Sequence, residues 1–155
     1  ILKEIVSFLD KRPLFTRNIV GVEEGIYRSM AGNADEMIVV GKLIKMGFNC
    51  SRVDVTSSKY DAVIDKKGRL LRIQIKATKT DTLDLTSGGR SGQQISRDAP
   101  SRVKKLTEKD CDIFIGVLKE SAICYVIPAK DLKNFGNNVN LKTISSYKEN
   151  WDNIK

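Results

Sequence analysis

The sequence predicts one α/β (α+β) domain in which a mixed central β-sheet is flanked by helices. The chain has 155 residues, a length that suits one domain with its own core. Its composition, 41% hydrophobic and 30% charged residues, is that of a globular protein. Apolar patterns follow the order helix, three strands, basic loop, two strands, helix. We expect residues 1–155 to form this domain, with 1–31 as an N-terminal helical extension of unclear role.

Helical spacing of apolar residues predicts a helix over residues 2–10. A second helix is expected to begin after a break at Gly32-Asn33, with Asn33 as its N-cap, and to run to about Met46. Gly47 is a natural residue to end it.

The side chain of Glu36 lies on the apolar stripe of this second helix, in line with Val40, Leu43 and Gly47. That stripe is the one expected to face the sheet. A charge in such a place is costly unless it is paired or binds a metal.

Three strands are predicted next, over residues 50–55, 60–65 and 69–78, and Lys67-Gly68 makes a hairpin turn between the last two. A glycine-rich loop follows over 87–92 and a short helix over 101–106. Two apolar runs, 112–118 and 123–128, predict buried strands, and the tail over 141–154 is expected to be helical, with Trp151 docked on the core.

The positive charge is concentrated in one part of the chain. The sequence holds 27 Lys and Arg against 19 Asp and Glu, a net charge of +8. Between Lys66 and Lys105 there are eleven basic and three acidic residues, so this segment carries the whole excess. A localised excess favours a polyanion-binding face, although a solvated basic surface has the same composition.

The absence of histidine excludes several kinds of chemistry. With His 0, there is no Ser-His-Asp triad, no histidine general base and no His-ligated zinc. The 3 cysteines are too scattered for a zinc site or a disulfide framework. No apolar run reaches the ~18 residues of a membrane span, and no signal-peptide pattern opens the chain. We expect a cytoplasmic protein, nucleoid-associated when bound to DNA, with no membrane partner.

Residues 69–78, RLLRIQIKAT, carry the most informative pattern. Alternation places Ile73 and Ile75 on one face of the strand, and Gln74 and Lys76 on the other. A tight hairpin brings Asp61 of the preceding strand beside Gln74 and Lys76. Taken alone, each of these residues has an ordinary structural explanation; their joint spacing with Glu36 favours a site.

This set resembles the PD-(D/E)XK nuclease superfamily, whose pattern is a helix glutamate, an aspartate and then (D/E/Q)-x-K on the next strand. The matching pieces are Glu36 in ADEMIVVGKLIKMGF, Asp61 in KYDAVID and Gln74-Ile75-Lys76 in RIQIKAT. The Q-x-K variant is similar to the branch of small group I intron-associated homing endonucleases and Holliday junction resolvase relatives. The likeness spans residues 32–130 and implies a restriction-endonuclease-like core.

The resemblance implies a Mg²⁺-dependent endonuclease that cuts double-stranded DNA, with Mn²⁺ as a substitute ion. Asp61 would be the central metal ligand, joined by the backbone carbonyl of Ile75 and by Glu36. Lys76 would orient the attacking water, stabilise developing charge or act as the base. Gln74 brings an amide where other members carry an acid, which favours one tightly bound metal ion over two.

We expect DNA contacts from residues near this set, because arginine and glutamine read base edges while serine and lysine suit phosphates. The candidates are Ser57, Ser58, Lys59, Lys79, Arg90, Gln93, Gln94 and Arg97.

A duplex break needs two active sites, so a homodimer or homotetramer is expected. The role could be homing, restriction or junction resolution. The alternatives are a resolvase-like structure-specific nuclease, a catalytically inactive DNA-binding domain with this fold, and an accessory domain that binds no nucleic acid.

Overall fold

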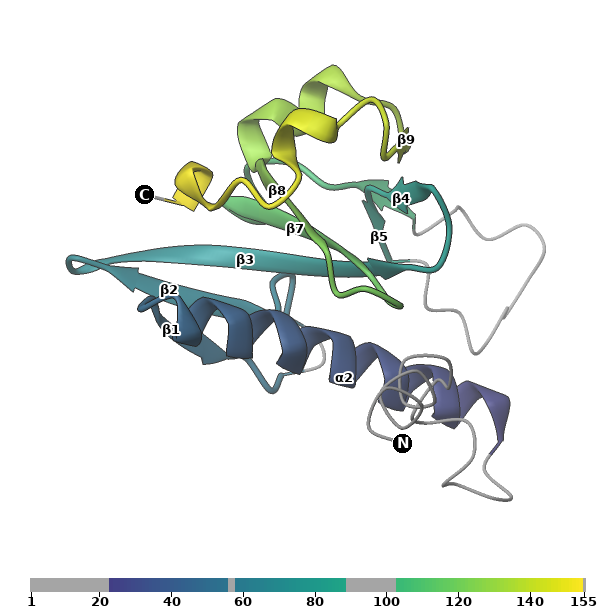
Figure 1. Cartoon of the computed structure of the whole chain (residues 1–155), viewed down its shortest axis with the longest axis horizontal. Helices are drawn as coiled ribbons and strands as arrows, with labels where there is room; N and C mark the ends of the chain where they lie inside the picture. Colours follow the sequence, from purple (N-terminus) through teal and green to yellow (C-terminus); the bar gives the residue numbers. More distant parts are fainter. Residues whose placement is uncertain (1–22, 56–57, 89–102, 155) are drawn as a thin grey trace, which may run out of the picture.

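The computed structural model describes residues 23–55, 58–88 and 103–154. Its centre is a five-stranded sheet in the order β1-β2-β3-β7-β8, and helix α2 lies along one face (Figure 1). β3 and β7 pair in parallel, and the other neighbours pair antiparallel. The predicted mixed sheet with flanking helical structure is therefore confirmed. The strands are β1 (Asn49–Arg52), β2 (Ala62–Lys66), β3 (Arg69–Thr78), β7 (Ile113–Leu118) and β8 (Cys124–Pro128).

Helix α2 spans Glu24–Lys45, so the predicted start at Asn33 is wrong. The Gly32-Asn33 pair is helical because a tertiary contact uses the Asn33 side chain: its Oδ1 accepts a hydrogen bond from Arg52 Nη2 at 2.7 Å. The predicted end is confirmed, since Gly47 follows the helix with a left-handed φ of 86°.

The β2–β3 hairpin forms as expected. Lys67 and Gly68 both have positive φ, 52° and 83°, the conformation of a two-residue turn that matches strand twist. β3 has the predicted bounds, whereas β1 and β2 are displaced by one to three residues at their ends.

Short strands and 3₁₀ turns complete the fold around the sheet; most of them cover the face opposite α2, whereas the last turn packs into the core on the α2 side. β4 (Thr82–Asp84) pairs with β9 (Asn138–Asn140), and β5 (Thr86–Ser87) pairs with β6 (Lys104–Lys105). The short helix predicted over 101–106 is wrong in its described part, because Lys104–Lys105 hydrogen-bond to β5 instead. The tail forms two 3₁₀ turns, η2 (Ser145–Tyr147) and η3 (Trp151–Ile154), and a third, η1 (Ala129–Asn134), follows β8. Trp151 packs on the core as expected.

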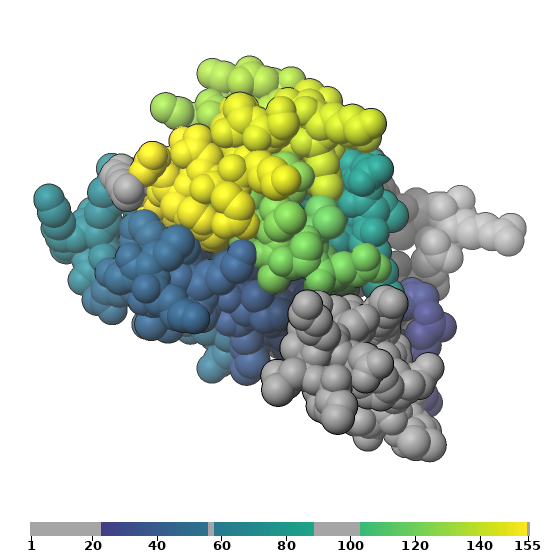
Figure 2. All heavy atoms as spheres, viewed as in Figure 1, coloured from purple at the N-terminus to yellow at the C-terminus, as the bar shows by residue number. Residues whose placement is uncertain are grey.

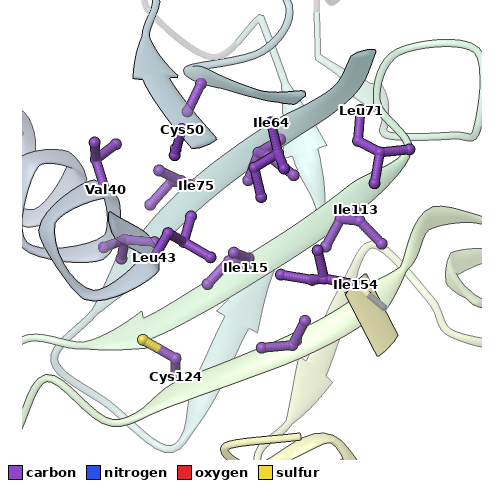
Figure 3. Packing of buried hydrophobic residues seen from close by; sticks show 14 of the residues in the cluster. Val40, Leu43, Cys50, Ile64, Leu71, Ile75, Ile113, Ile115, Cys124 and Ile154 are labelled. Atoms are coloured by element: carbon purple, nitrogen blue, oxygen red, sulfur yellow. The ribbon is translucent and has the colours of Figure 1, made fainter. Parts of the chain in front are cut away.

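A hydrophobic core lies on each side of the sheet. On the α2 side, Val39, Val40 and Leu43 meet the inward side chains of β3, including Ile73 and Ile75 (Figure 3). Full burial of one such side chain contributes about 1.5–3 kcal/mol. The opposite core is built on Phe114 of β7, packed against residues of β4, β8 and β9. Because β7 is covered on both faces, it is the buried centre of the fold.

The predicted helix over 2–10 and most of the loop over 87–92 lie outside the described residues. Among the helices that are described, none has the length and apolar character needed to cross a membrane.

Candidate active site

Asp61 is fixed where β2 begins. Its backbone extends the sheet by one residue, with Asp61 N donating to Ile73 O and Val53 N donating to Asp61 O, both at 2.8 Å. Its carboxylate Oδ2 accepts hydrogen bonds from the backbone N of Ile75 at 2.7 Å and from Gln74 Nε2 at 2.5 Å. The predicted contact between Asp61 and Gln74 is therefore present.

Gln74 joins two oxygens of the site. Its Nε2 lies 2.5 Å from Asp61 Oδ2 and 3.3 Å from the carbonyl oxygen of Ile75. The side chain is 9% exposed and comes from the face of β3 opposite Ile73 and Ile75, as alternation predicts. One N–H₂ donor group thus contacts both oxygens. A hard cation that prefers oxygen ligands fits the same donor set.

Within the described residues, no group of three or more Asp, Glu, Cys or His side chains is arranged to hold a metal ion. A metal here would depend on the Asp61 carboxylate and the Ile75 carbonyl, with Glu36 and an amide oxygen of Gln74 as the further donors.

Lys76 follows Gln74 by two residues, so its side chain leaves the same face of β3. Its Nζ lies 3.6 Å from Asp84 Oδ2 of β4. Asp84 is held by its own turn, because its Oδ1 accepts hydrogen bonds from Thr86 N at 2.8 Å and from Thr86 Oγ1 at 2.6 Å. The sequence pattern did not point to Asp84. The Asp-x-Thr pattern signals a local turn and says nothing of a distant lysine.

Gly116 allows Asp84 to reach this position. Gly116 pairs with Lys76 across β3 and β7, and the Leu83 side chain occupies the space where a Cβ of Gly116 would project. Such a Cβ would lie 2.9 Å from Leu83 Cδ2 and 3.1 Å from its Cγ. The missing side chain lets β4 lie close to the sheet, which places the next residue, Asp84, beside Lys76.

Glu36 faces the sheet, as predicted, and is only 16% exposed at its side chain. Its Oε2 lies 3.4 Å from Arg52 Nη2 of β1. Arg52 pairs in register with Ala62, the neighbour of Asp61, so the Glu36–Arg52 pair lies next to the strand end that carries Asp61. The guanidinium offsets the cost of placing the Glu36 charge against the sheet.

Asp35, which is not part of the nuclease motif, is the most buried acid of α2. It is 8% exposed, and its Oδ2 lies 3.2 Å from Lys119 Nζ in the β7–β8 turn. This pair ties the helix to the sheet beside Glu36. The signal available in the sequence was two adjacent acids, and only one could be assigned to the motif.

The predicted DNA-contact residues fall into two groups. Ser58 Oγ donates to Tyr60 O at 2.7 Å in a turn just before Asp61. Lys59 Nζ lies 3.1 Å from Asp110 Oδ1, and Lys79 is exposed beyond the end of β3. Burial alone would raise the pKa of Asp110, but hydrogen bonds from Thr107 and Lys59 outweigh it and lower that pKa. Outside the described residues lie Ser57, Arg90, Gln93, Gln94 and Arg97.

Comparisons with known proteins identify the fold and the family of the chain. The solved structure of a bacterial homing endonuclease, I-Ssp6803I, is similar to this chain with a TM-score of 0.66 and 20% sequence identity. The match covers 81% of this chain and 91% of that one. No curated protein sequence matches the chain.

A family described as PD-(D/E)XK endonuclease matches residues 28–155, which include Glu36, Asp61, Gln74 and Lys76. Nucleases of this family generally use divalent metal ions. By fold, by motif and by this match, the chain belongs to the PD-(D/E)XK endonuclease family.

Proposed function

We propose that this nuclease hydrolyses phosphodiester bonds of double-stranded DNA with Mg²⁺, for which Mn²⁺ can substitute. The observation that carries the proposal is the convergence of Asp61 Oδ2 and the Ile75 carbonyl on the Gln74 amide, 2.5 Å and 3.3 Å away. Phosphodiester hydrolysis needs a nucleophilic water and neutralisation of charge on the phosphoryl oxygens. A bound Mg²⁺ would supply both. The family's use of divalent ions supports this reading.

The metal would be held by the Asp61 carboxylate and by the carbonyl oxygen of Ile75. Glu36 would bind it directly or through a water molecule. Rotation of the Gln74 amide would present Oε1 in place of Nε2, so this residue can change from a donor to Asp61 into a neutral ligand. Glu36 would contribute to metal binding, and Arg52, 3.4 Å away, balances its charge.

Lys76 would hold the attacking water or stabilise the negative charge that develops on the phosphoryl oxygens. Asp84 would act on Lys76 as a positioning residue. Its carboxylate is fixed by Thr86 and offers the ammonium one partner at 3.6 Å. A lysine side chain has several rotatable bonds, and a fixed counter-ion reduces the number of places its head group occupies.

Double-stranded DNA is the substrate class that the charge favours. The chain carries +8, and all of the excess lies between Lys66 and Lys105, the stretch that also holds Gln74, Lys76 and Asp84. The structural likeness to a homing endonuclease supports site-specific cutting. A homo-oligomer is proposed because a duplex break needs two active sites. We place the protein in the cytoplasm, at the nucleoid when bound to DNA.

Plasmid nicking in Mg²⁺ or Mn²⁺ tests the proposal, with Asp61→Asn and Lys76→Met as active-site variants. We expect each to lower the cleavage rate at least about 10²-fold, the scale of losing a central electrostatic contact. Asp81→Asn and Lys142→Met, at exposed positions, are the controls and should cut at the wild-type rate.

DNA binding with no cleavage in either ion would refute the enzyme and favour an inactive DNA-binding domain. Absence of binding at low salt would favour an accessory domain. Preferential cutting of four-way junctions over linear duplex would assign the enzyme to the resolvase type.

A further inference from the structure

Helix α2 carries a second apolar stripe on the side away from the sheet. Its inner face is formed by Val39, Val40 and Leu43. The outer stripe recurs with alternating spacings of three and four, the a and d pattern of a coiled coil. Its members are Tyr27, Met30, Ala34, Met37, Gly41 and Ile44, which we call the seam.

The C-terminal part of the seam is open to solvent. Met37 is 59% and Ile44 54% exposed, and the flanking Ile26 and Ile38 are 54% and 43% exposed. Figure 2 shows part of α2, in purple to dark blue, at the molecular surface, and Figure 1 shows the helix below the sheet. Single exposed apolar residues need no explanation, but an ordered stripe along a 22-residue helix indicates an interaction surface.

We propose that the seam is a homodimer interface in which α2 of one chain packs antiparallel against α2 of a second copy. We align the two helices so that large residues oppose small ones. In this register Met37 faces the partner's Ala34, and Met30 faces the partner's Gly41. A coiled-coil seam with small residues at alternate positions lets two helix backbones approach closely.

Gly41 supports a close approach. Nothing in the described chain lies within 4 Å of where its Cβ would be, so packing within the monomer does not require glycine there. Glycine inside a helix costs about 0.5–1 kcal/mol relative to alanine. A second helix backbone at this position gives the glycine a steric reason.

Charge selects the antiparallel orientation. Glu24 lies in the first turn of α2 and Lys45 in the last, both in the position that flanks the seam. Antiparallel packing places Glu24 of each chain near Lys45 of the other, whereas parallel packing would leave these opposite charges at opposite ends of the helix pair. The intrachain partner of Glu24 is Arg28, in a pair about three-quarters exposed, and such pairs contribute little. Glu24 is therefore available to a partner.

The dimer deepens the proposed function, because two copies supply the two active sites that a duplex break needs, and it is measurable without any activity. Light scattering and sedimentation of the full chain should give twice the monomer mass. Met37→Glu should give monomers with the wild-type circular dichroism spectrum. Leu70→Glu, at an equally exposed apolar residue on the β2–β3 hairpin, is the matched control and should remain dimeric.

Two further variants separate the interface from an effect on folding. Gly41→Ala should raise the melting temperature of the monomer, because alanine favours the helix more than glycine does. The same variant should weaken dimerisation at least about 10-fold, because the added Cβ prevents the close approach of the two helices. Lys45→Glu should weaken the dimer, and the combined Glu24→Lys and Lys45→Glu swap should restore it.

A wild-type protein that stays monomeric across micromolar concentrations would overturn the proposal. The occupant of the seam would then be residues 1–22 of the same chain or another protein. A Met37→Glu variant that stays dimeric would also overturn it. The two proposals fail separately: a dimer that cuts nothing refutes the nuclease, while a monomer that nicks DNA refutes the seam.

Discussion

The close packing at Gly116 predicts that Gly116→Ala damages stability and activity together. The new Cβ would clash with Leu83 Cδ1, its nearest neighbour, and would lie 2.9 Å from Cδ2 and 3.1 Å from Cγ, against the 3.5–4.0 Å of ordinary carbon contacts. Leu83 is 1% exposed and has little room to move. Overpacking of this kind costs about 1–3 kcal/mol. For a chain of this size, that lowers the melting temperature by about 2 to 12 °C.

The activity loss follows from what Leu83 carries. A shift of β4 away from β7 moves Asp84 from Lys76, and we expect kcat to fall about 10-fold with KM little changed. Asp84→Asn should reproduce the loss of kcat without the loss of stability, and Asp81→Asn in the same loop should do neither. Melting curves and initial cleavage rates on one plasmid substrate measure both effects.

A double-mutant cycle isolates the clash. Leu83→Ala alone should cost about 2–5 kcal/mol through the cavity it leaves, but Gly116→Ala should cost almost nothing in that background. Gly136→Ala is the control, since its Cβ would meet the nearest atom, Asn138 O, at 3.6 Å. A Gly116→Ala protein with wild-type melting temperature and kcat would refute the reasoning.

Three other predictions follow from the packing. Burial opposes ionisation of Asp112, but hydrogen bonds from Arg72 outweigh burial and lower the pKa of this carboxyl below 3.8. The ionised carboxylate therefore stabilises the fold above pH 3.8, and its contribution is lost as the pH falls through the lowered pKa. Urea unfolding of Asp112→Asn should show a loss of about 1–2 kcal/mol at pH 7 and a shallower pH dependence below 4, and an unchanged acid limb would contradict this. Lys67→Asn should raise stability by about 0.5 kcal/mol in thermal melts, because asparagine adopts positive φ more readily; a lower melting temperature would argue against the turn. Burial raises the pKa of the three native thiols, Cys50, Cys111 and Cys124, to about 11 or 12. A disulfide reagent at pH 8 should therefore label them only after unfolding. Fast labelling of the native protein would disprove their burial.

Local pattern was sufficient for the parts of the fold that depend on neighbours in sequence. β3 was placed to the residue because its alternation is strict and Lys67-Gly68 fixes the turn before it. The contact between Asp61 and Gln74 then follows from hairpin register. Gly47 ended the helix because its positive φ is a local requirement.

Long-range contacts decided the rest. The start of α2 was misplaced because Asn33, which favours a cap in isolation, accepts instead from Arg52 of β1. Lys104–Lys105 became a strand because Thr86–Ser87 offers a partner far away in sequence. Asp84 stayed hidden for the same reason, since its meeting with Lys76 depends on a glycine 32 positions further along the chain.

The hydrogen bond from the main-chain N of Ile75 to Asp61 has a consequence for how this protein responds to heat. The Asp61 carboxylate is hydrogen-bonded to the middle of β3 rather than to a loop that can open alone. Residual cleavage after brief heating and near-ultraviolet ellipticity should therefore decline along one superimposable curve.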